Sequence, residues 1–207
     1  DAFGLGGVGR AVVDDGSTDG SVDMLRNEFP EVRVIVNERN LGVAKAYNRG
    51  VVHVRGRYVQ MLNTDMLLIN NAIKTLMDFL ETHPEAGACG AWLRNPDMTS
   101  QVSFGNFPSF LQAIVDALFL NDLFPNAGFP NRGAHPTESM TEPFEVEYVT
   151  GASMLIRKDV IDKLGFFDER FTSYCEETDF CHRVKNEAGL KMFFVPRAQI
   201  IHFGGAS

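Results

Sequence analysis

Basic residues are scarce in this chain relative to acidic ones. The 207 residues include 19 Lys and Arg against 27 Asp and Glu, which gives a formal net charge of −8. Proteins that bind nucleic acid generally need a basic face, because they displace counterions from the phosphates. The composition therefore argues against a general nucleic-acid-binding protein, and we expect no nucleic-acid partner.

Cysteines are also few. The chain has Cys89, Cys175 and Cys181, and no two of them have C-x-x-C spacing. Small domains held together by disulfides usually carry an even number of closely spaced cysteines. Three scattered cysteines suit a reducing compartment, where each is expected to be a small buried side chain. We therefore expect a cytoplasmic protein.

Long hydrophobic runs are missing as well. No run reaches the roughly 18 consecutive apolar residues that a membrane-spanning helix needs. The most apolar stretch, residues 107–129, is interrupted by Asp116, Asn121 and Asp122. We expect it to form an apolar helix or loop that covers another part of the protein. A chain of this length can bury a core without disulfides or a structural metal, so residues 1–207 are expected to form one domain.

Strand and helix patterns alternate in the first half of the chain. Each short apolar or β-branched run is followed by an amphipathic stretch. Such alternation calls for parallel strands joined by right-handed crossovers. We predict an α/β fold, Rossmann-like, with a mostly parallel sheet flanked by helices. The strands are predicted at 11–13, 32–36 and 58–62, and the helices at 20–29, 43–54 and 71–82.

The second half is less regular. Residues 94–143 are rich in Asn, Pro, Gly and Phe, and they show little periodicity, which is typical of a substrate-facing insertion. Regular patterns return after this insertion. Further strands are predicted at 87–93, 144–150, 153–157, 191–195 and 199–203, and helices at 158–164 and 176–187.

Polar residues follow the predicted strands of the first half. Asp14 and Asp15 follow the first strand, Asn40 follows the second, and Asp65 follows the third. In open α/β sheets, ligands bind outside the carboxyl ends of the strands. Acidic side chains there can accept hydrogen bonds from ribose hydroxyls or from a base N–H. The alternative for Asp14 and Asp15 is a loop of surface carboxylates that caps the next helix.

Two residues are candidate metal ligands. Asp65 ends an apolar run, where a carboxylate is costly to bury without a partner. Mg²⁺ is a suitable partner, because it commonly takes one or two protein carboxylates together with substrate phosphates. The alternative is an Asp that caps the following turn. His202 lies among apolar residues, where a hydrogen-bonded core histidine is the more common case.

Three acidic residues, Glu176, Glu177 and Asp179, open the predicted helix 176–187. Acids in a first turn interact favourably with the helix dipole, which also keeps them ionised. They are therefore either helix-stabilising charges or candidates for acid–base chemistry. Asp179 is also spaced to pair with Arg183 on the next turn.

Together these segments resemble the family 2 glycosyltransferases, inverting enzymes of the GT-A fold, and especially their rhamnosyltransferase-like bacterial members. The order and spacing of the motifs agree from about residue 11 onward. The matching motifs are Val12–Ser21, Asn40–Gly50, Leu62–Asp65, Gly151–Arg157, Gly165–Phe171, Glu176–Arg183 and His202–Gly205.

The resemblance implies that a sugar moves from a nucleotide-diphosphate donor, either dTDP-rhamnose-like or a UDP-sugar, to a glycan or lipid-linked hydroxyl acceptor. It divides the domain into a nucleotide-sugar-binding half, an acceptor-side insertion, and an acceptor and catalytic half. A lipid-linked acceptor implies peripheral association with the inner face of the membrane. The three parts are residues 11–93, 94–143 and 144–207.

The resemblance also assigns the donor side. Asp14 corresponds to the acid that contacts the base or ribose, and Asp65 to the last Asp of a DxD-type motif that holds Mg²⁺ or Mn²⁺ on the diphosphate. His202 matches a His that adds to this site in some members. The metal neutralises charge on the leaving nucleotide diphosphate. The other implied donor-binding residues are Asp15, Asn40, Gly42, Lys45, Asn48 and Asn63.

On the acceptor side, Glu177 matches the catalytic base of the family, which is usually Asp. A carboxylate there would take the acceptor proton while the oxygen attacks the anomeric carbon, which gives inversion in one step. Glu176 and Asp179 are implied as acceptor-side or supporting acids, and Glu176 is the base if the register shifts by one residue.

The sequence departs from the family in two places. Asn63-Thr64-Asp65 retains a single carboxylate where the family commonly has more, so modest metal affinity is expected. The family also begins with an apolar strand and a helix that residues 1–10 do not supply. We therefore expect a fragment with an exposed sheet edge, which invites pairing with a second copy.

Two other functions fit the pattern less well. A GT-A module without catalytic activity could bind a nucleotide or a glycan. A nucleotidyltransferase would share the sheet and the metal-bound acid. It would also carry a Gly-rich loop with Lys or Arg after its first strand to hold a triphosphate, and this sequence has no such loop.

Overall fold

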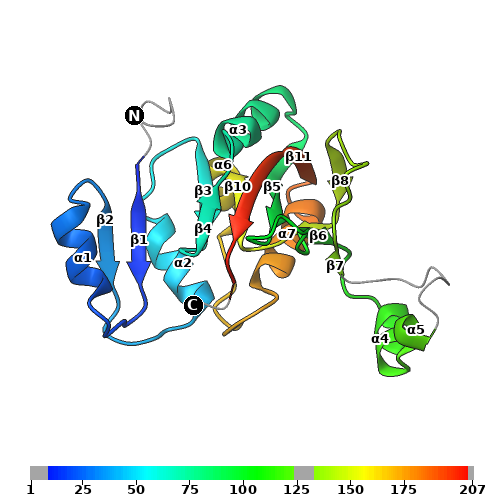
Figure 1. Cartoon of the computed structure of the whole chain (residues 1–207), viewed down its shortest axis with the longest axis horizontal. Coiled ribbons are helices and arrows are strands. Elements are labelled where there is room, and N and C mark those ends of the chain that lie inside the picture. Colours follow the sequence, from blue (N-terminus) through cyan, green and yellow to red (C-terminus); the bar gives the residue numbers. More distant parts are fainter. Residues whose placement is uncertain (1–8, 124–132, 205–207) are drawn as a thin grey trace.

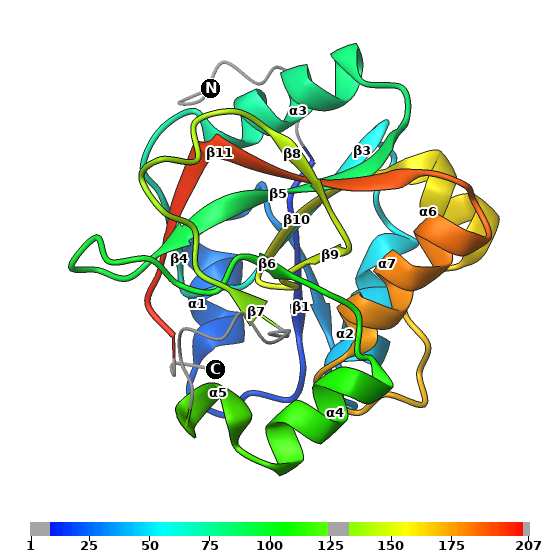
Figure 2. The same ribbon diagram turned by 90° about the vertical axis from the view of Figure 1, so that its right-hand side faces the viewer.

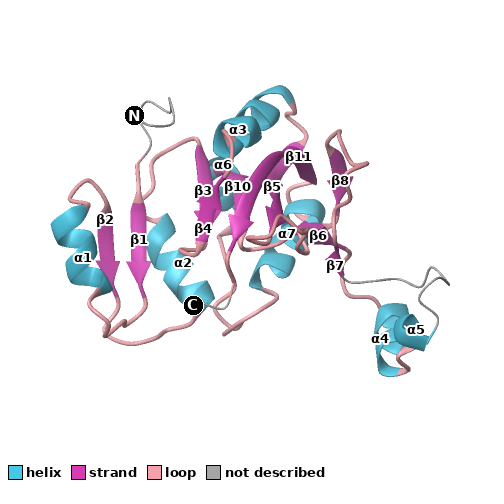
Figure 3. Cartoon of the chain, viewed as in Figure 1, coloured by secondary structure: helices cyan, strands magenta, loops and turns pink. Residues whose placement is uncertain are grey.

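The computed structural model describes residues 9–123 and 133–204. Strands run through the middle of the molecule and helices lie on either side of them (Figure 1, Figure 3). The strands are β1 (Ala11–Asp14), β2 (Arg33–Val36), β3 (Tyr58–Leu62), β4 (Met66–Leu68), β5 (Ala86–Arg94), β6 (Phe104–Gly105), β7 (Gly133–Ala134), β8 (Phe144–Val146), β9 (Tyr148–Val149), β10 (Ser153–Arg157) and β11 (Lys191–His202). The helices are α1 (Ser21–Glu28), α2 (Val43–Val51), α3 (Ala72–Thr82), α4 (Phe110–Ala117), α5 (Leu120–Leu123), α6 (Lys158–Leu164) and α7 (Glu176–Asn186).

The central sheet has six strands in the order β3-β10-β5-β11-β4, with β8 paired to β11. Strand β5 pairs with β11 in parallel, whereas β10 is antiparallel to both β3 and β5. Strands β4 and β8 are antiparallel to β11. Strands β3, β5 and β11 therefore run in one direction, and β4, β8 and β10 run in the other. Strands β1 and β2 form a separate parallel pair.

The predicted α/β architecture is confirmed, and the pairing differs from the prediction in one respect. The central sheet is mixed rather than mostly parallel. Strand β10 follows the short strands β8 and β9 and lies between β3 and β5, with Ser153 opposite Leu62 at the carboxyl end of β3. Antiparallel pairing needs no helical crossover, whereas parallel pairing does. Strand β4 follows β3 after a short turn but pairs with β11, to which it is antiparallel.

Strand β5 forms the centre of two hydrophobic clusters, one on each face of the sheet. Its nine residues are all buried. Ala88 and Trp92 belong to the cluster that contains α7, and Cys89 and Leu93 belong to the cluster that contains α3. Successive side chains of a strand point to opposite faces, so one strand serves both clusters. Figure 2 shows α3 and α7 on opposite sides of β5.

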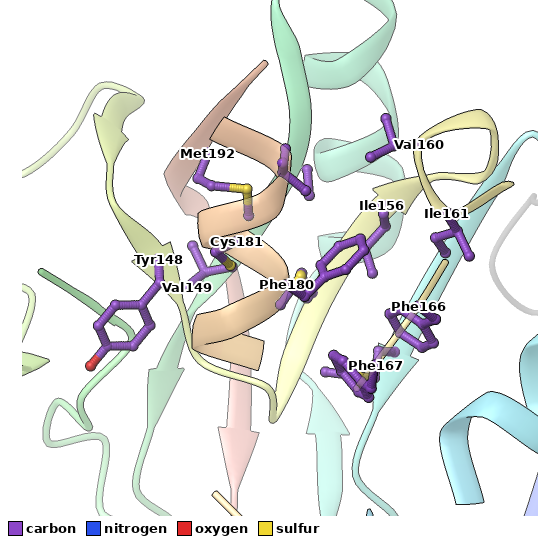
Figure 4. Packing of buried hydrophobic residues seen from close by; sticks show 14 of the residues in the cluster. Tyr148, Val149, Ile156, Val160, Ile161, Phe166, Phe167, Phe180, Cys181 and Met192 are labelled. Carbon is purple, nitrogen blue, oxygen red and sulfur yellow. The ribbon is translucent and has the colours of Figure 1, made fainter. Parts of the chain in front are cut away.

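Helix α7 is held by its apolar face. Phe180, Cys181 and Val184 are fully buried, and burial of each large apolar side chain contributes about 1.5–3 kcal/mol. Figure 4 shows Phe180 and Cys181 among Val149, Ile156 and other core residues. This packing fixes the first turn of α7, which carries the three acidic residues of the sequence motif.

The insertion is more regular than its sequence suggests. It contains the helices α4 and α5 and the strands β6 and β7. These two strands form a short sheet with β9, which follows the insertion, in the order β7-β6-β9. These helices project from the body of the molecule (Figure 1). The expectation that this apolar stretch covers another part of the protein holds only in part for the described residues. Phe107 packs against the core cluster and Val115 is buried, whereas Phe110 is 83% exposed and Phe119 is 66% exposed. Residues 124–132 lie outside the described part.

Within the described ranges, every helix is too short or too polar to cross a bilayer.

Candidate active site

Asp65 and His202 meet because β4 pairs with the end of β11. Met66 lies opposite His202 in this antiparallel pair, and the backbone oxygen of Asp65 accepts a 3.0 Å hydrogen bond from the N–H of Phe203. Asp65 Oδ1 lies 3.4 Å from His202 Nε2. The structure thus brings together the two residues that the sequence analysis assigned to a metal.

The carboxylate of Asp65 is buried without a hydrogen-bond partner. Its side chain is only 6% exposed, and neither Oδ1 nor Oδ2 accepts a hydrogen bond. An ionised carboxylate in this setting is costly unless a charge compensates it. No group of three or more His, Cys, Asp or Glu side chains is arranged for a metal within the described residues. One carboxylate with one imidazole fits a hard cation that takes its remaining ligands from phosphates and water.

Tyr47 extends from α2 to the same place. Its hydroxyl donates to the carbonyl oxygen of Leu62 at 3.3 Å and to Asn63 Oδ1 at 3.4 Å. Burial, together with the negative charges of Glu176 and Asp65, raises the pKa of Tyr47 to about 12. Tyr47 is therefore a protonated donor beside two carboxylates. Tyr47 is not among the residues predicted for the site, although it lies within the motif Asn40–Gly50.

Glu176 and Glu177 occupy the first turn of α7. Glu176 is buried, and its Oε2 has no hydrogen-bond partner. Glu177 is half-buried, and an ideal Cβ on Gly151 would lie 3.4 Å from the Cβ of Glu177. The loop before β10 therefore passes close to this acid.

The turn that leads into α7 is strained. Tyr174 and Cys175 have φ angles of 66° and 71°, a left-handed conformation that costs about 1–3 kcal/mol for a residue other than glycine. Strain of this kind is concentrated at functional sites, where the surrounding structure maintains it. Here two consecutive strained residues set the position of Glu176 and Glu177.

Asp179, the third acid of the motif, forms an ion pair within α7. Its Oδ2 accepts a 2.8 Å hydrogen bond from Arg183 Nε, as the four-residue spacing predicts. The guanidinium also donates to backbone oxygens at the end of α6, including those of Leu164 and Phe166. Asp179 therefore orients an arginine that holds α6 against α7.

Asp14 and Asp15 end β1 and have different surroundings. Asp14 is buried, and its Oδ2 accepts hydrogen bonds from the N–H groups of Gly16 and Ser17, both at 3.1 Å. Asp15 instead holds the loop that follows β2. Its carboxylate accepts hydrogen bonds from Asn37 Nδ2 at 2.7 Å and from the backbone N–H groups of Leu41 and Gly42.

The loop after β2 requires glycine at position 42. Gly42 has a φ of +89°, and a Cβ there would lie 2.8 Å from the backbone oxygen of Thr172. Asn40 supports the same turn, because its Oδ1 accepts a 3.0 Å hydrogen bond from the N–H of Gly42. This close approach joins the loops after β1 and β2 to the segment that precedes α7.

Lys45 and Asn48 lie further along α2. Lys45 is exposed. The amide of Asn48 is used within the fold, since its Nδ2 donates to the backbone oxygen of Phe167 at 2.8 Å and its Oδ1 accepts from the N–H of Phe167 at 3.0 Å. Asn48 thus connects α2 to the segment between α6 and α7.

Seven of the predicted residues form two groups. Asn63, Asp65 and His202 lie around the β4–β11 pair, and the Tyr47 hydroxyl donates to Asn63 Oδ1. The charges of Glu176 and Asp65 both raise the pKa of Tyr47, so Glu176 also lies near this group. The second group follows β1 and β2 and consists of Asp14, Asp15, Asn40 and Gly42.

The profile of the family described as Glycosyl transferase family 2 matches residues 11–165. This chain belongs to that family. A similar relative is the N-acetylglucosaminyl-diphospho-decaprenol L-rhamnosyltransferase of Mycobacterium tuberculosis, which is 29% identical over 204 residues that cover 92% of this chain. The rhamnosyltransferase WbbL of Escherichia coli K12 is 25% identical over 147 residues that cover 70% of this chain. The chain spans 65% of the mycobacterial relative and 52% of WbbL.

Solved structures show the GT-A fold of this family 2 domain. One neighbour is GalNAc-T7 with UDP, GalNAc and Mn²⁺, with a TM-score of 0.64, 14% identity, and coverage of 93% of this chain and 37% of the neighbour. Another is the mannosyltransferase PcManGT of Pyrobaculum calidifontis with GDP-Man and Mn²⁺, with a TM-score of 0.60, 16% identity, and coverage of 93% and 46%. The predicted membership of family 2, among its rhamnosyltransferase-like members, is confirmed.

Proposed function

We propose that this domain transfers a sugar from a nucleotide-diphosphate donor to a hydroxyl acceptor with the help of Mg²⁺ or Mn²⁺. The observation that carries the proposal is the buried Asp65 carboxylate, which has no hydrogen-bond partner and lies beside His202. A cation brought by the donor diphosphate would compensate this charge. The Mn²⁺ recorded with nucleotide or nucleotide sugar in both structural neighbours supports this assignment.

Different residues of the chain would bind the metal, the base or ribose, and the phosphates of the donor. Asp65 and His202 would hold the metal, whose charge stabilises the departing nucleotide diphosphate. Asp14 would accept hydrogen bonds from the base or ribose. Asn63 would contact the donor beside Asp65, and the exposed Lys45 would attract its phosphates. Asp15, Asn40, Gly42 and Asn48 would shape the surrounding loops through the contacts described above.

Glu177 is the proposed general base. Its carboxylate would take the proton of the acceptor hydroxyl as the oxygen attacks the anomeric carbon opposite the leaving group, which inverts the configuration. Glu176 is the alternative base, because it lies in the same turn and its Oε2 has no hydrogen-bond partner. Asp179 would support the site indirectly, through Arg183.

The names of the relatives favour a particular donor and acceptor. The mycobacterial and Escherichia coli relatives are both named as rhamnosyltransferases, and the former name includes a diphospho-decaprenol acceptor. We therefore propose a dTDP-rhamnose-like donor, with a UDP-sugar second, and a lipid-linked glycan acceptor at the inner face of the membrane.

The test measures release of nucleotide diphosphate from a panel of dTDP- and UDP-sugars with Mn²⁺ and a polyprenyl-diphosphate glycan. General base catalysis typically contributes 10²–10⁴-fold, so we expect Glu177→Gln to lower kcat by at least about 100-fold. Asp65→Asn should weaken activation by Mn²⁺. The matched control is Glu187→Gln, which alters an exposed acid just beyond α7 and should leave the rate unchanged.

Two results would contradict the proposal. One is the absence of nucleotide diphosphate release from every donor, and if calorimetry then shows donor binding, the domain is a binding module. The other is a wild-type rate in Glu177→Gln. If Glu176→Gln alone abolishes the rate, the base is Glu176.

A further inference from the structure

Gln101 lies against the side of His202 that faces away from Asp65. Its Oε1 is 2.8 Å from His202 Nδ1, and its Nε2 donates to the backbone oxygen of His202 at 2.7 Å. The same Nε2 donates to Asn95 Oδ1 at 2.6 Å. Gln101 belongs to the insertion, so a residue of the acceptor side is hydrogen-bonded to the proposed metal site.

The hydrogen bonds of Gln101 determine which ring nitrogen of His202 carries the proton. Because Nε2 of Gln101 donates to two oxygens, the atom that faces the imidazole is the acceptor Oε1. His202 Nδ1 must then be the donor, and in the neutral ring Nε2 presents a lone pair. That lone pair points toward the unpartnered carboxylate of Asp65 at 3.4 Å. Two acceptors converge there, as they would around a cation.

We propose that Gln101 is a positioning residue for the metal site. It holds His202 in the Nδ1–H tautomer and in a fixed orientation, so that Nε2 is available to the cation beside Asp65. Partners of this kind commonly fix the tautomer and the orientation of a metal-binding histidine. The inference rests on the proposed metal-dependent function, and it names a residue that the family resemblance did not assign.

The position of Gln101 gives it a second consequence. With His202 and Asn95 it lines a pocket of about 430 Å³, whose other lining residues include Ser100 and Thr150. A group bound in this pocket would touch the residue that orients His202. Binding in this pocket would thereby affect the proposed metal site through one amide.

The first experiment measures Mn²⁺ affinity by calorimetry in the presence of saturating UDP, and separately of dTDP. Gln101→Leu removes the acceptor for Nδ1–H, and loss of such a partner typically weakens metal binding 10–100-fold. Gln101→Glu keeps an acceptor but loses both amide donations, and should bind Mn²⁺ at least as tightly as the wild type. Asn95→Ala is the control, which removes the other partner of Gln101 and should change the affinity less than about threefold.

The outcomes separate this inference from the proposed function. If Gln101 only stabilises the fold, Gln101→Glu and Asn95→Ala weaken binding as much as Gln101→Leu does, and the inference is overturned. Wild-type affinity in Gln101→Leu also overturns it. If the wild-type protein binds no Mn²⁺ with either nucleotide, the metal site of the proposed function fails, and the inference fails with it.

A second experiment needs neither metal nor activity. The ¹⁵N spectrum of histidine-labelled protein distinguishes the two tautomers, and His202→Ala identifies the signal. We expect a protonated Nδ1 in the wild type and in Gln101→Glu, and a shift toward protonated Nε2 in Gln101→Leu. A wild-type imidazole protonated on Nε2 alone would overturn the inference.

Discussion

The hydroxyl of Tyr47 loses its proton only at high pH. Burial and the nearby carboxylates raise its pKa to about 12, whereas a tyrosine in the unfolded chain ionises near pH 10. Between about pH 10 and pH 12 the unfolded state therefore binds fewer protons than the folded state does, so the free energy of unfolding falls as the pH rises. Two pKa units correspond to about 2–3 kcal/mol.

We expect the contribution of Tyr47 to the pH dependence of the free energy of unfolding to disappear in Tyr47→Phe. Urea unfolding at several pH values between 9 and 11.5 measures it, and the informative quantity is the difference in slope between variant and wild type. Tyr174→Phe is the control, because Tyr174 is 82% exposed and its removal should leave the wild-type slope unchanged. Equal slopes in Tyr47→Phe and the wild type would contradict the raised pKa.

At the scale of single residues, the sequence predicted that Asp65 and His202 share a site, but it did not predict what the other candidate side chains contact. Asp65 and His202 do meet. Asp15 and Asn48, assigned to the donor from motif position, have their polar atoms hydrogen-bonded to neighbouring segments of the fold. A carboxylate or amide after a strand can face a ligand or a neighbouring loop, and the path of that loop decides between them.

Among the elements, α3 depends on an arginine from a distant strand. Arg157, at the end of β10, donates to the backbone oxygens of Leu80, His83 and Ala86, at 2.5, 3.1 and 2.7 Å. The last carbonyl groups of a helix have no partner within the helix, so this guanidinium caps α3. Hydrogen bonds to charged groups contribute about 1.5–3 kcal/mol each.

We expect Arg157→Met to lower the free energy of unfolding by about 2–3 kcal/mol, because methionine keeps much of the apolar stem but leaves the carbonyl groups unpaired. Chemical denaturation measures the loss. Arg49→Met, which alters an exposed arginine on α2, should change stability by less than about 0.5 kcal/mol. A loss in Arg157→Met no larger than in this control would show that the cap contributes little.

The elements themselves were predicted unevenly. Helices with a clear apolar face, such as α2, α3 and α7, begin within a residue or so of the predicted positions. The antiparallel entry of β10 and the two-residue strands β6 and β7 were not predicted. Strands that short have no detectable periodicity, and the direction of β10 depends on the path of the chain through β8 and β9.

At the scale of the whole molecule, the thiols of Cys89 and Cys181 lie on opposite faces of the central sheet. Cys89 lies in the cluster around α3 and Cys181 in the cluster around α7, and both are fully buried. Burial raises the pKa of the Cys181 thiol to about 12 and that of Cys89 higher still. Thiolates are the reactive form of cysteine, so both thiols are protected in the folded protein.

We expect one of the three thiols, Cys175, to react with an aromatic disulfide reagent in the native protein, since it is only half-buried. The other two should become reactive at the same denaturant concentration if the two clusters unfold together. Mass spectrometry of labelled peptides measures each site. Labelling of Cys181 at a lower concentration than Cys89 would show instead that the α7 side unfolds separately.

The β4–β11 pair also has a consequence for synthesis of the protein. Asp65 and His202 are far apart in the chain, and contacts of large sequence separation form late because a long loop must close first. A ribosome that has made β1 to β5 has already produced Asp65, but no imidazole stands beside it until β11 has been made and docked. The growing chain therefore lacks the proposed metal site until β11 has been made and has paired with β4.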